Sequence, residues 1–142
     1  MPPEKDHEFA FSPASNLCLN GRVAKHGEFP VAGGGYADVW AGTLDGRKVA
    51  LKIVRPWGIK DHKLVKRLWR EHLIWSTLNH PNVLPFLGFC TGASSGGNVL
   101  APWFVSPWMD NGTLLDYLAI YPLADRLKIV RGIGHISGNI RI

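Results

Sequence analysis

The fold is decided by one stretch of sequence, RKVALKIVR at positions 47–55. Alternation along this stretch puts Val49, Leu51 and Ile53 on one side. Lys52 falls on the other side, between two further apolar residues. The pattern predicts a β-strand that carries a single lysine in an apolar setting. Such a lysine either reaches water along a sheet edge or holds a charged partner.

The residues before this strand predict a hairpin. Residues 36–44 are strand-like, and Asp45-Gly46 is a strong turn signal because glycine tolerates positive φ. Residues 33–35 are three consecutive glycines, which let a backbone approach a phosphate closely and point N–H groups at it. A run of three glycines is also typical of a flexible turn, so this signal needs support from elsewhere.

A helix is predicted over residues 60–78. Leu64, Leu68, Trp75 and Leu78 recur at steps that share one helical face, and Glu71 falls on the same face. A carboxylate facing the core is costly unless it is paired. We therefore expect Glu71 to meet Lys52. The alternatives are a purely structural ion pair, or a helix rotated so that Glu71 meets water.

The remaining pattern completes an α+β fold: an antiparallel five-stranded sheet packed on one main helix. Strands are expected over residues 83–90 and 99–105, with a loop of small residues between them. Thr113 is a plausible cap for a helix over residues 114–119, and a further helix begins near Asp125. Residues 1–25 are polar and turn-rich, and they predict a flexible lead-in with at most one short strand.

Composition limits the class of protein. The 142 residues suit one compact domain, and 46% hydrophobic content is enough for a core. The net charge of +5 indicates solvated basic helix faces, with a nucleic-acid surface as the less favoured alternative. The two cysteines lack metal-ligand spacing, and no apolar stretch is long enough to span a bilayer. These features predict a cytoplasmic protein with no membrane partner.

Residues 106–112 are expected to form an extended linker after the last strand. Pro107 removes one backbone donor, whereas the N–H and C=O of Met109 remain free to pair with the edge of a planar ligand such as adenine. The signal is weak by itself and gains meaning from its position in the chain.

Taken together and in order, these residues resemble the protein kinases, most closely the tyrosine-kinase-like subgroup, over residues 29–133. The likeness rests on several segments at the family's spacing. They are AGGGYADVW (32–40) for the glycine-rich loop, VALK (49–52) for the lysine strand, Glu71 for the helix glutamate, HPNVLPFLG (80–88) for the connection after that helix, VSPWM (105–109) for the linker with Ser106 at the gatekeeper position, and NGTL (111–114) for the next helix start.

The resemblance implies that residues 26–142 form a partial protein kinase domain. Residues 26–108 would be the small lobe, and residues 109–142 the linker and an incomplete large lobe. Lys52 and Glu71 would be the catalytic pair that orients the phosphates of ATP. The ATP-binding residues would be Gly33, Gly34, Gly35, Tyr36, Val39, Ala50, Lys52, Ser106 and Met109. Mg²⁺ would bind only if the missing half were supplied, and no metal-binding residue is assigned in this chain.

Two departures from the family pattern limit what the resemblance implies. Ala32 and Ala37 stand where the first and third loop glycines usually lie, so only Gly34 occupies a signature glycine position. The sequence also contains no His-Arg-Asp, Asp-Phe-Gly or Ala-Pro-Glu motif. The segment SGNIR (137–141) only faintly resembles a catalytic loop, and its Asn139 cannot act as a base.

We therefore expect ATP binding without phosphoryl transfer by this chain alone. The alternative is a non-catalytic interaction module, a pseudokinase-like regulator that competes with full-length relatives. Such a module would bind other proteins through the surface that should face the large lobe. A basic nucleic-acid-binding domain is the third and least favoured possibility.

Overall fold

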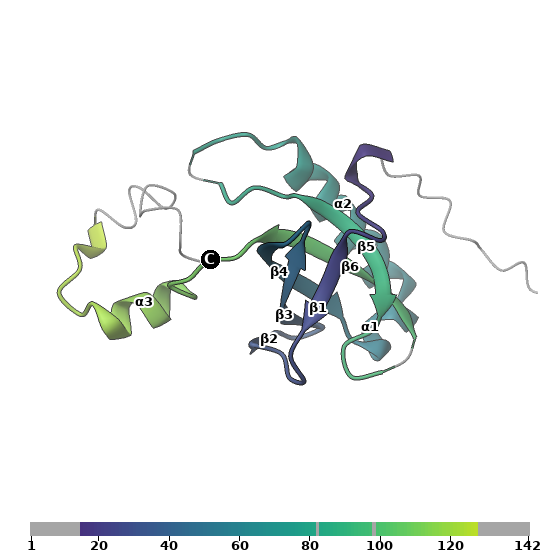
Figure 1. Ribbon diagram of the computed structural model, residues 1–142, viewed down its shortest axis with the longest axis horizontal. Helices are drawn as coiled ribbons and strands as arrows, with labels where there is room; N and C mark the ends of the chain where they lie inside the picture. The colour runs from purple at the N-terminus through teal and green to yellow at the C-terminus, as the bar shows by residue number, and fades with distance from the viewer. Residues whose placement is uncertain (1–14, 82, 98, 128–142) are drawn as a thin grey trace, which may run out of the picture.

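The computed structural model describes residues 15–127 except residues 82 and 98. Its centre is an antiparallel sheet with the strand order β1-β3-β4-β6-β5, and the short strand β2 also pairs with β3 (Figure 1). The predicted α+β fold, with a five-stranded sheet and one main helix, is confirmed. The elements in chain order are η1 (Ser15–Leu17), β1 (Val23–His26), β2 (Ala32–Gly33), β3 (Ala37–Leu44), β4 (Arg47–Val54), α1 (Pro56–Lys60), α2 (His62–Thr77), β5 (Gly88–Ala93), β6 (Leu100–Pro107) and α3 (Leu114–Ile120).

The β3–β4 hairpin forms as predicted. Its turn residues Asp45 and Gly46 both have positive φ, 49° and 81°, which suits the right-handed twist of a two-residue hairpin. Arg22 holds this turn from outside through an ion pair with Asp45. The eight-residue pairing from Ala37–Val54 to Leu44–Arg47 fixes which side chains of the two strands share a face.

The sheet separates two sets of core residues. On one face, Trp40, Leu51 and Val105 lie opposite one another on three neighbouring strands. The core on this face consists of Leu19, Trp40, Val49, Leu51, Ile53, Cys90 and Val105. The other core cluster consists of Val54, Leu68, Ala101 and Phe104. The alternation predicted for residues 49–54 is therefore confirmed, and Leu19 ties residues before β1 to the sheet.

Helix α2 packs on the second face. It begins after Asp61, whose carboxylate accepts hydrogen bonds from the N–H groups of Lys63 and Leu64 at 3.0 and 3.1 Å. On the inner side of the helix, the Trp69 ring meets Phe104 edge-on, with 5.5 Å between ring centroids. The His72 ring stacks on Phe104 at 3.5 Å.

The inward stripe expected for this helix is partly wrong. The buried residues are Val65, Leu68 and His72, whereas Glu71 is exposed and Leu78 is 50% exposed. Trp69 and His72 bring aromatic rings onto Phe104, and they turn the helix so that the carboxylate faces water. Burying those rings is favourable, whereas burying an unpaired carboxylate is costly.

The strand expected over residues 83–90 starts later, at Gly88, and continues to Ala93. The segment before it approaches α2 instead, since Trp75 Nε1 donates a hydrogen bond to the Leu84 carbonyl at 2.5 Å. Pro85 also lacks the N–H that a ladder requires. The loop of small residues expected over 91–98 is correspondingly shorter.

Helix α3 follows the linker and stands apart from the sheet (Figure 1). The predicted Thr113 cap is confirmed: its side chain accepts a hydrogen bond from the Asp116 N–H, and Asp116 bonds back to the Thr113 N–H. None of the residues of α3 is buried. The further helix expected to begin near Asp125 lies mostly outside the described residues. In the part of the chain that is described, no helix has the length and apolar character needed to cross a membrane.

Candidate nucleotide-binding site

Strand register gathers four of the predicted site residues on one face of the sheet. Val39 lies opposite Lys52, and Ala50 lies opposite Ser106. Directly opposed residues of antiparallel strands share a face, and these two pairs fall on alternate positions of β4. Ala50 and Ser106 are buried, whereas Val39 and Lys52 are half-buried.

The three glycines span the end of β2, where Gly33 is the last residue, and the turn that leads to β3. The Gly34 N–H donates to the Ala37 carbonyl at 2.9 Å, which closes a tight loop over Gly35 and Tyr36. The Arg55 N–H donates to the Tyr36 carbonyl at 2.9 Å, which holds the loop against the end of the lysine strand. All three glycines are exposed, as a loop that approaches a ligand requires.

Lys52 has its closest described partner in this glycine loop. Its Nζ donates a hydrogen bond to the Tyr36 hydroxyl at 3.3 Å and lies 5.2 Å from the centroid of the Tyr36 ring. The ammonium group therefore lies under the loop. A cation held there is placed to meet an anion that the loop also contacts.

Glu71 does not form the expected ion pair with Lys52. Its carboxylate lies on the exposed side of α2, with Oε1 3.6 Å from Arg67 Nε one turn earlier. Since neither Lys52 nor Glu71 contacts the other among the described ion pairs, the expected pair is absent from this conformation. The rotated helix, kept open as an alternative from the sequence, is the arrangement observed.

His72 takes the inward position beside Lys52, and sequence reasoning missed it. The Nδ1 atom of His72 lies 2.6 Å from the Leu68 carbonyl, so Nδ1 carries the proton. Burial is the main cause that lowers the pKa of His72 to about 4; the Leu68 hydrogen bond opposes the shift, and the positive charge of Lys52 makes a smaller contribution in the same direction as burial. The imidazole is therefore neutral near Lys52. The spacing of Val65, Leu68 and His72 was the signal in the sequence that could have revealed it.

The linker residue Met109 lies two residues after the end of β6 and is buried. Its carbonyl accepts a hydrogen bond from the Gly112 N–H at 3.0 Å, so the expectation that both backbone groups are free is wrong for this carbonyl. Within the described residues, the Met109 N–H makes no backbone hydrogen bond. The neighbouring Trp108 ring is covered by Lys48, whose Nζ lies 4.4 Å from the ring centroid.

This geometry is a lysine on the inner face of a curled antiparallel sheet, under a glycine turn and beside an extended linker. This arrangement is that of the small lobe of a protein kinase, and it defines the class of protein as kinase-like. The family model "Protein tyrosine and serine/threonine kinase" matches residues 28–133 of this chain. That match covers more than half of the chain, and the chain therefore belongs to this family.

Individual relatives agree with the family assignment. The chain is 32% identical over 96 residues to the serine/threonine-protein kinase STY46 of Arabidopsis thaliana, covering 66% of this chain and 16% of that protein. It is 29% identical over 106 residues to the probable serine/threonine-protein kinase drkD of Dictyostelium discoideum, covering 75% and 7%. It is 33% identical over 89 residues to the human interleukin-1 receptor-associated kinase-like 2, covering 62% and 13%. The chain thus spans less than a fifth of the length of each of these three relatives.

Proposed function

We propose that this chain binds ATP on the Lys52 face of the sheet. The adenine ring would lie against Val39, Ala50 and Ser106, with the Met109 N–H as a donor to its edge. The phosphates would lie under the turn formed by Gly33, Gly34, Gly35 and Tyr36. The observation that carries the proposal is the strand register, which aligns Val39 with Lys52 and Ala50 with Ser106.

Lys52 would hold a phosphate oxygen in this site. Its present contact, the Tyr36 hydroxyl, is a neutral acceptor at 3.3 Å, which is long for such a bond. A charged phosphate oxygen makes a stronger, charge-assisted bond to the same ammonium group. We expect the phosphate to displace Tyr36 and leave its ring as part of the cover.

Glu71 retains its proposed role as the partner of Lys52 only in a second position of α2. A rotation that exchanges His72 for Glu71 at the inner face would bring the carboxylate toward the lysine. Binding of nucleotide phosphate near Lys52 adds negative charge there, which does not by itself favour bringing the Glu71 carboxylate closer. We therefore assign the pair to a conformation that differs from the one described.

A thermal-shift titration tests nucleotide binding. ATP with Mg²⁺ should raise the melting temperature of the purified chain, because a ligand that binds only the folded state stabilises it. Lys52→Ala should weaken ATP binding about tenfold or more, since hydrogen bonds to charged groups contribute ~1.5–3 kcal/mol. Lys63→Ala, on the exposed side of α2, removes the same charge and should leave binding unchanged. No shift in the wild-type chain at millimolar ATP would refute the proposal.

Phosphoryl transfer is not proposed for these 142 residues alone. The reaction needs magnesium ligands and a residue that positions the attacking hydroxyl, and the family's motifs for both are not found in this sequence. Incubation with radiolabelled ATP and Mg²⁺ should therefore give no labelled protein. Magnesium-dependent labelling that disappears in Lys52→Ala would contradict this expectation.

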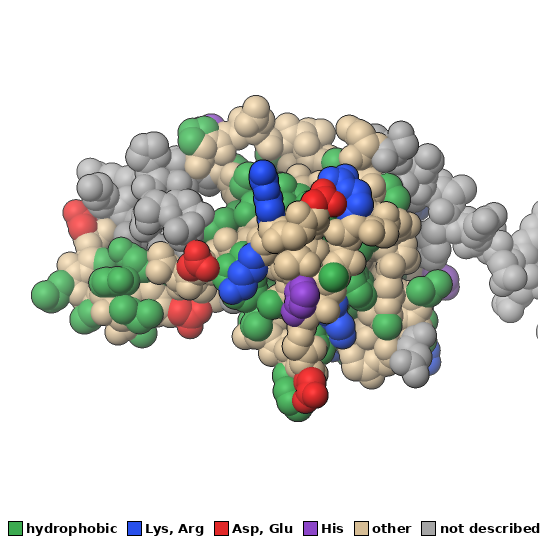
Figure 2. Space-filling model, in the orientation of Figure 1, with side chains coloured by type: hydrophobic (Ala, Val, Ile, Leu, Met, Phe, Trp, Pro, Cys, Tyr) green, Lys and Arg blue, Asp and Glu red, His purple; other side chains and the backbone are tan. Residues whose placement is uncertain are grey.

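Binding of another protein remains a second candidate function, and the exposed apolar residues of α3 and of the turn after it favour this function. Leu115, Ile120 and Leu123 are 78%, 65% and 98% exposed. Figure 2 shows hydrophobic side chains gathered over this end of the molecule. A surface of this kind is expected to contact protein, whether the remainder of a large lobe or a partner.

Assignment to the tyrosine-kinase-like subgroup and a cytoplasmic location stay predictions from the sequence.

A further inference from the structure

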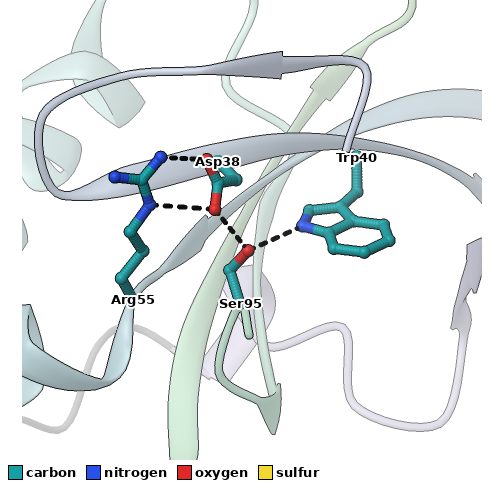
Figure 3. A network of polar contacts seen from close by, with 4 residues as sticks. All are labelled: Asp38, Trp40, Arg55 and Ser95. Carbon is teal, nitrogen blue, oxygen red and sulfur yellow. Dashed lines mark hydrogen bonds and ion pairs between the residues drawn. The ribbon is translucent and has the colours of Figure 1, made fainter. Parts of the chain in front are cut away.

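A buried polar network lies on the face of the sheet opposite to Lys52. It joins Asp38 and Trp40 of β3, Arg55 directly after β4, and Ser95 between β5 and β6 (Figure 3). Arg55 donates to both oxygens of Asp38, from Nη2 to Oδ1 at 2.6 Å and from Nε to Oδ2 at 3.0 Å. The Ser95 hydroxyl donates to Asp38 Oδ2 at 2.6 Å, and Trp40 Nε1 donates to Ser95 Oγ at 3.0 Å.

The carboxylate of Asp38 is the acceptor on which the network converges. Asp38 and Ser95 are only 7% and 5% exposed, so removing a partner would leave a buried polar group unsatisfied. The bidentate contact with Arg55 is the strong, directional kind of charge-assisted hydrogen bond. Arg55 accordingly lowers the pKa of the Asp38 carboxyl group, with a smaller contribution from Ser95.

The same residues hold the glycine turn through the main chain. Arg55 donates its N–H to the Tyr36 carbonyl at 2.9 Å, while its side chain binds Asp38. The Ser95 N–H donates to the Val54 carbonyl at 3.1 Å, next to Arg55. Asp38 itself follows Ala37, whose carbonyl closes the turn with Gly34. A shift of Asp38 or Arg55 would therefore move the turn.

The first arm of the turn also packs directly on the ion pair. A Cβ atom placed on Gly33 would lie 3.0 Å from Asp38 Oδ1 and 3.2 Å from Arg55 Nη2. Both distances are tighter than ordinary van der Waals contact. Gly33 thus has a reason to be glycine that does not involve a ligand: its backbone lies against the Asp38–Arg55 pair.

We propose that Asp38 is a positioning residue for phosphate binding, which acts by fixing the glycine turn through Arg55 and Ser95. The inference rests on the proposed function, because it requires that the turn contacts nucleotide phosphates. Asp38 faces away from Lys52 and does not touch the ligand. Its effect reaches the site through the backbone of residues 33–37, and it is specific to the phosphate end of the nucleotide.

Two ligands separate this role from a merely structural one. Competition against a fluorescent adenine nucleotide gives the Kd of ATP, which reaches the glycine turn, and of adenosine, which has no phosphates. Asp38→Asn keeps the size of the side chain but loses its charge. We expect this variant to weaken ATP binding at least about tenfold and to change adenosine binding less than about twofold. The proposed adenine contacts, at Val39, Ala50, Ser106 and the linker, lie on the face of the sheet opposite to the Asp38 side chain.

The matched control is Asp45→Asn, which removes the carboxylate of the exposed ion pair with Arg22 at the far end of the same hairpin. It should leave the binding of both ligands unchanged. Arg55→Lys keeps the charge but loses the bidentate geometry, and we expect it to weaken ATP binding less than Asp38→Asn does. If Asp38→Asn does not fold cooperatively, Arg55→Lys carries the comparison of the two ligands.

The outcomes separate the two proposals. If Asp38→Asn weakens the binding of ATP and of adenosine equally, or changes the binding of neither ligand, Asp38 is structural and this inference is overturned. If the wild-type chain binds neither ligand, the proposed function fails instead. A selective loss of ATP binding supports both.

Discussion

At the residue scale, His72 is a neutral imidazole buried between a helix and a sheet. Its ring stacks on Phe104, and the ammonium group of Lys52 is close enough to disfavour a second positive charge. An imidazole that must stay neutral in the folded state makes stability depend on pH. The sign of that dependence follows from the direction of the pKa shift.

The pKa of His72 falls from 6.5 to about 4 on folding. The unfolded chain therefore binds this proton first as the pH falls. The contribution of neutral His72 to the free energy of unfolding is complete above pH 6.5. As the pH falls from 6.5 to about 4, this contribution declines by roughly 3 kcal/mol in all. His72→Phe, which keeps an aromatic ring on Phe104, should lose most of this decline in urea unfolding measured across that range.

The control for that measurement is His26→Asn, which removes an exposed histidine on β1. It should retain the wild-type dependence on pH. If wild type and His72→Phe lose stability in parallel between pH 6.5 and pH 4, His72 is not the group responsible.

The difference between Glu71 and His72 shows where sequence reasoning about the site stops. The spacing of apolar residues identified the helix and its approximate inner side. It could not separate two adjacent positions, because one residue turns the helix by about 100°. The contacts of Trp69 and His72 with Phe104 decide the rotation, and they join residues that are 35 and 32 positions apart in the chain. By contrast, the alternation of Val49, Leu51 and Ile53 is local, and it placed Lys52 on its face correctly.

At the element scale, the β3–β4 hairpin is packed too closely for any side chain at Gly42. A Cβ atom there would lie 2.6 Å from the Ala24 carbonyl oxygen and 2.6 Å from Leu51 Cδ1. The first neighbour is backbone of β1 and cannot rotate away. The glycine is required by this close approach of β1 to β3 and by the core beneath it.

Gly42→Ala should therefore destabilise the chain by about 1–3 kcal/mol through overpacking. Chemical denaturation compares it with Gly35→Ala, where an added Cβ would meet nothing within 4 Å. Equal stability of the two alanine variants would mean that β1 does not pack against β3 as described.

The strands differ in how well the sequence predicts their ends. The β3–β4 hairpin has a turn signal whose two residues adopt the required positive φ, so both strands were placed within one residue. The start of β5 has no such signal. Residues 83–87 are apolar enough for a strand, but the contact between Trp75 and the Leu84 carbonyl draws them toward α2. That contact depends on the position of the helix, which the local sequence does not encode.

At the scale of the whole molecule, the apolar residues of α3 and of the turn that follows it are separate from the core of the sheet. Leu115, Ile120 and Leu123 are exposed, and no residue of α3 is buried. Their replacement should change what the surface binds without changing how the sheet folds.

The triple variant Leu115→Ser, Ile120→Ser, Leu123→Ser should bind less of a fluorescent dye for apolar surfaces and should aggregate less on heating. Its melting temperature should stay close to that of the wild type. Ile74→Ser, at a comparably exposed position of α2, is the matched control and should leave dye binding nearly unchanged. A large fall in the melting temperature of the triple variant would show that α3 packs on the sheet after all.

The central claim is that one face of the sheet, from the glycine turn through Lys52 to the linker, binds ATP. Backbone amide NMR during an ATP titration tests it most directly, because each segment reports separately. We predict saturable shifts of the amide signals of Gly33–Gly35, Lys52 and Met109. We predict no shift at the hairpin turn of Asp45 and Gly46, at the far end of β3 and β4. Shifts confined to other surfaces, or no saturable shift at millimolar ATP, would contradict the claim.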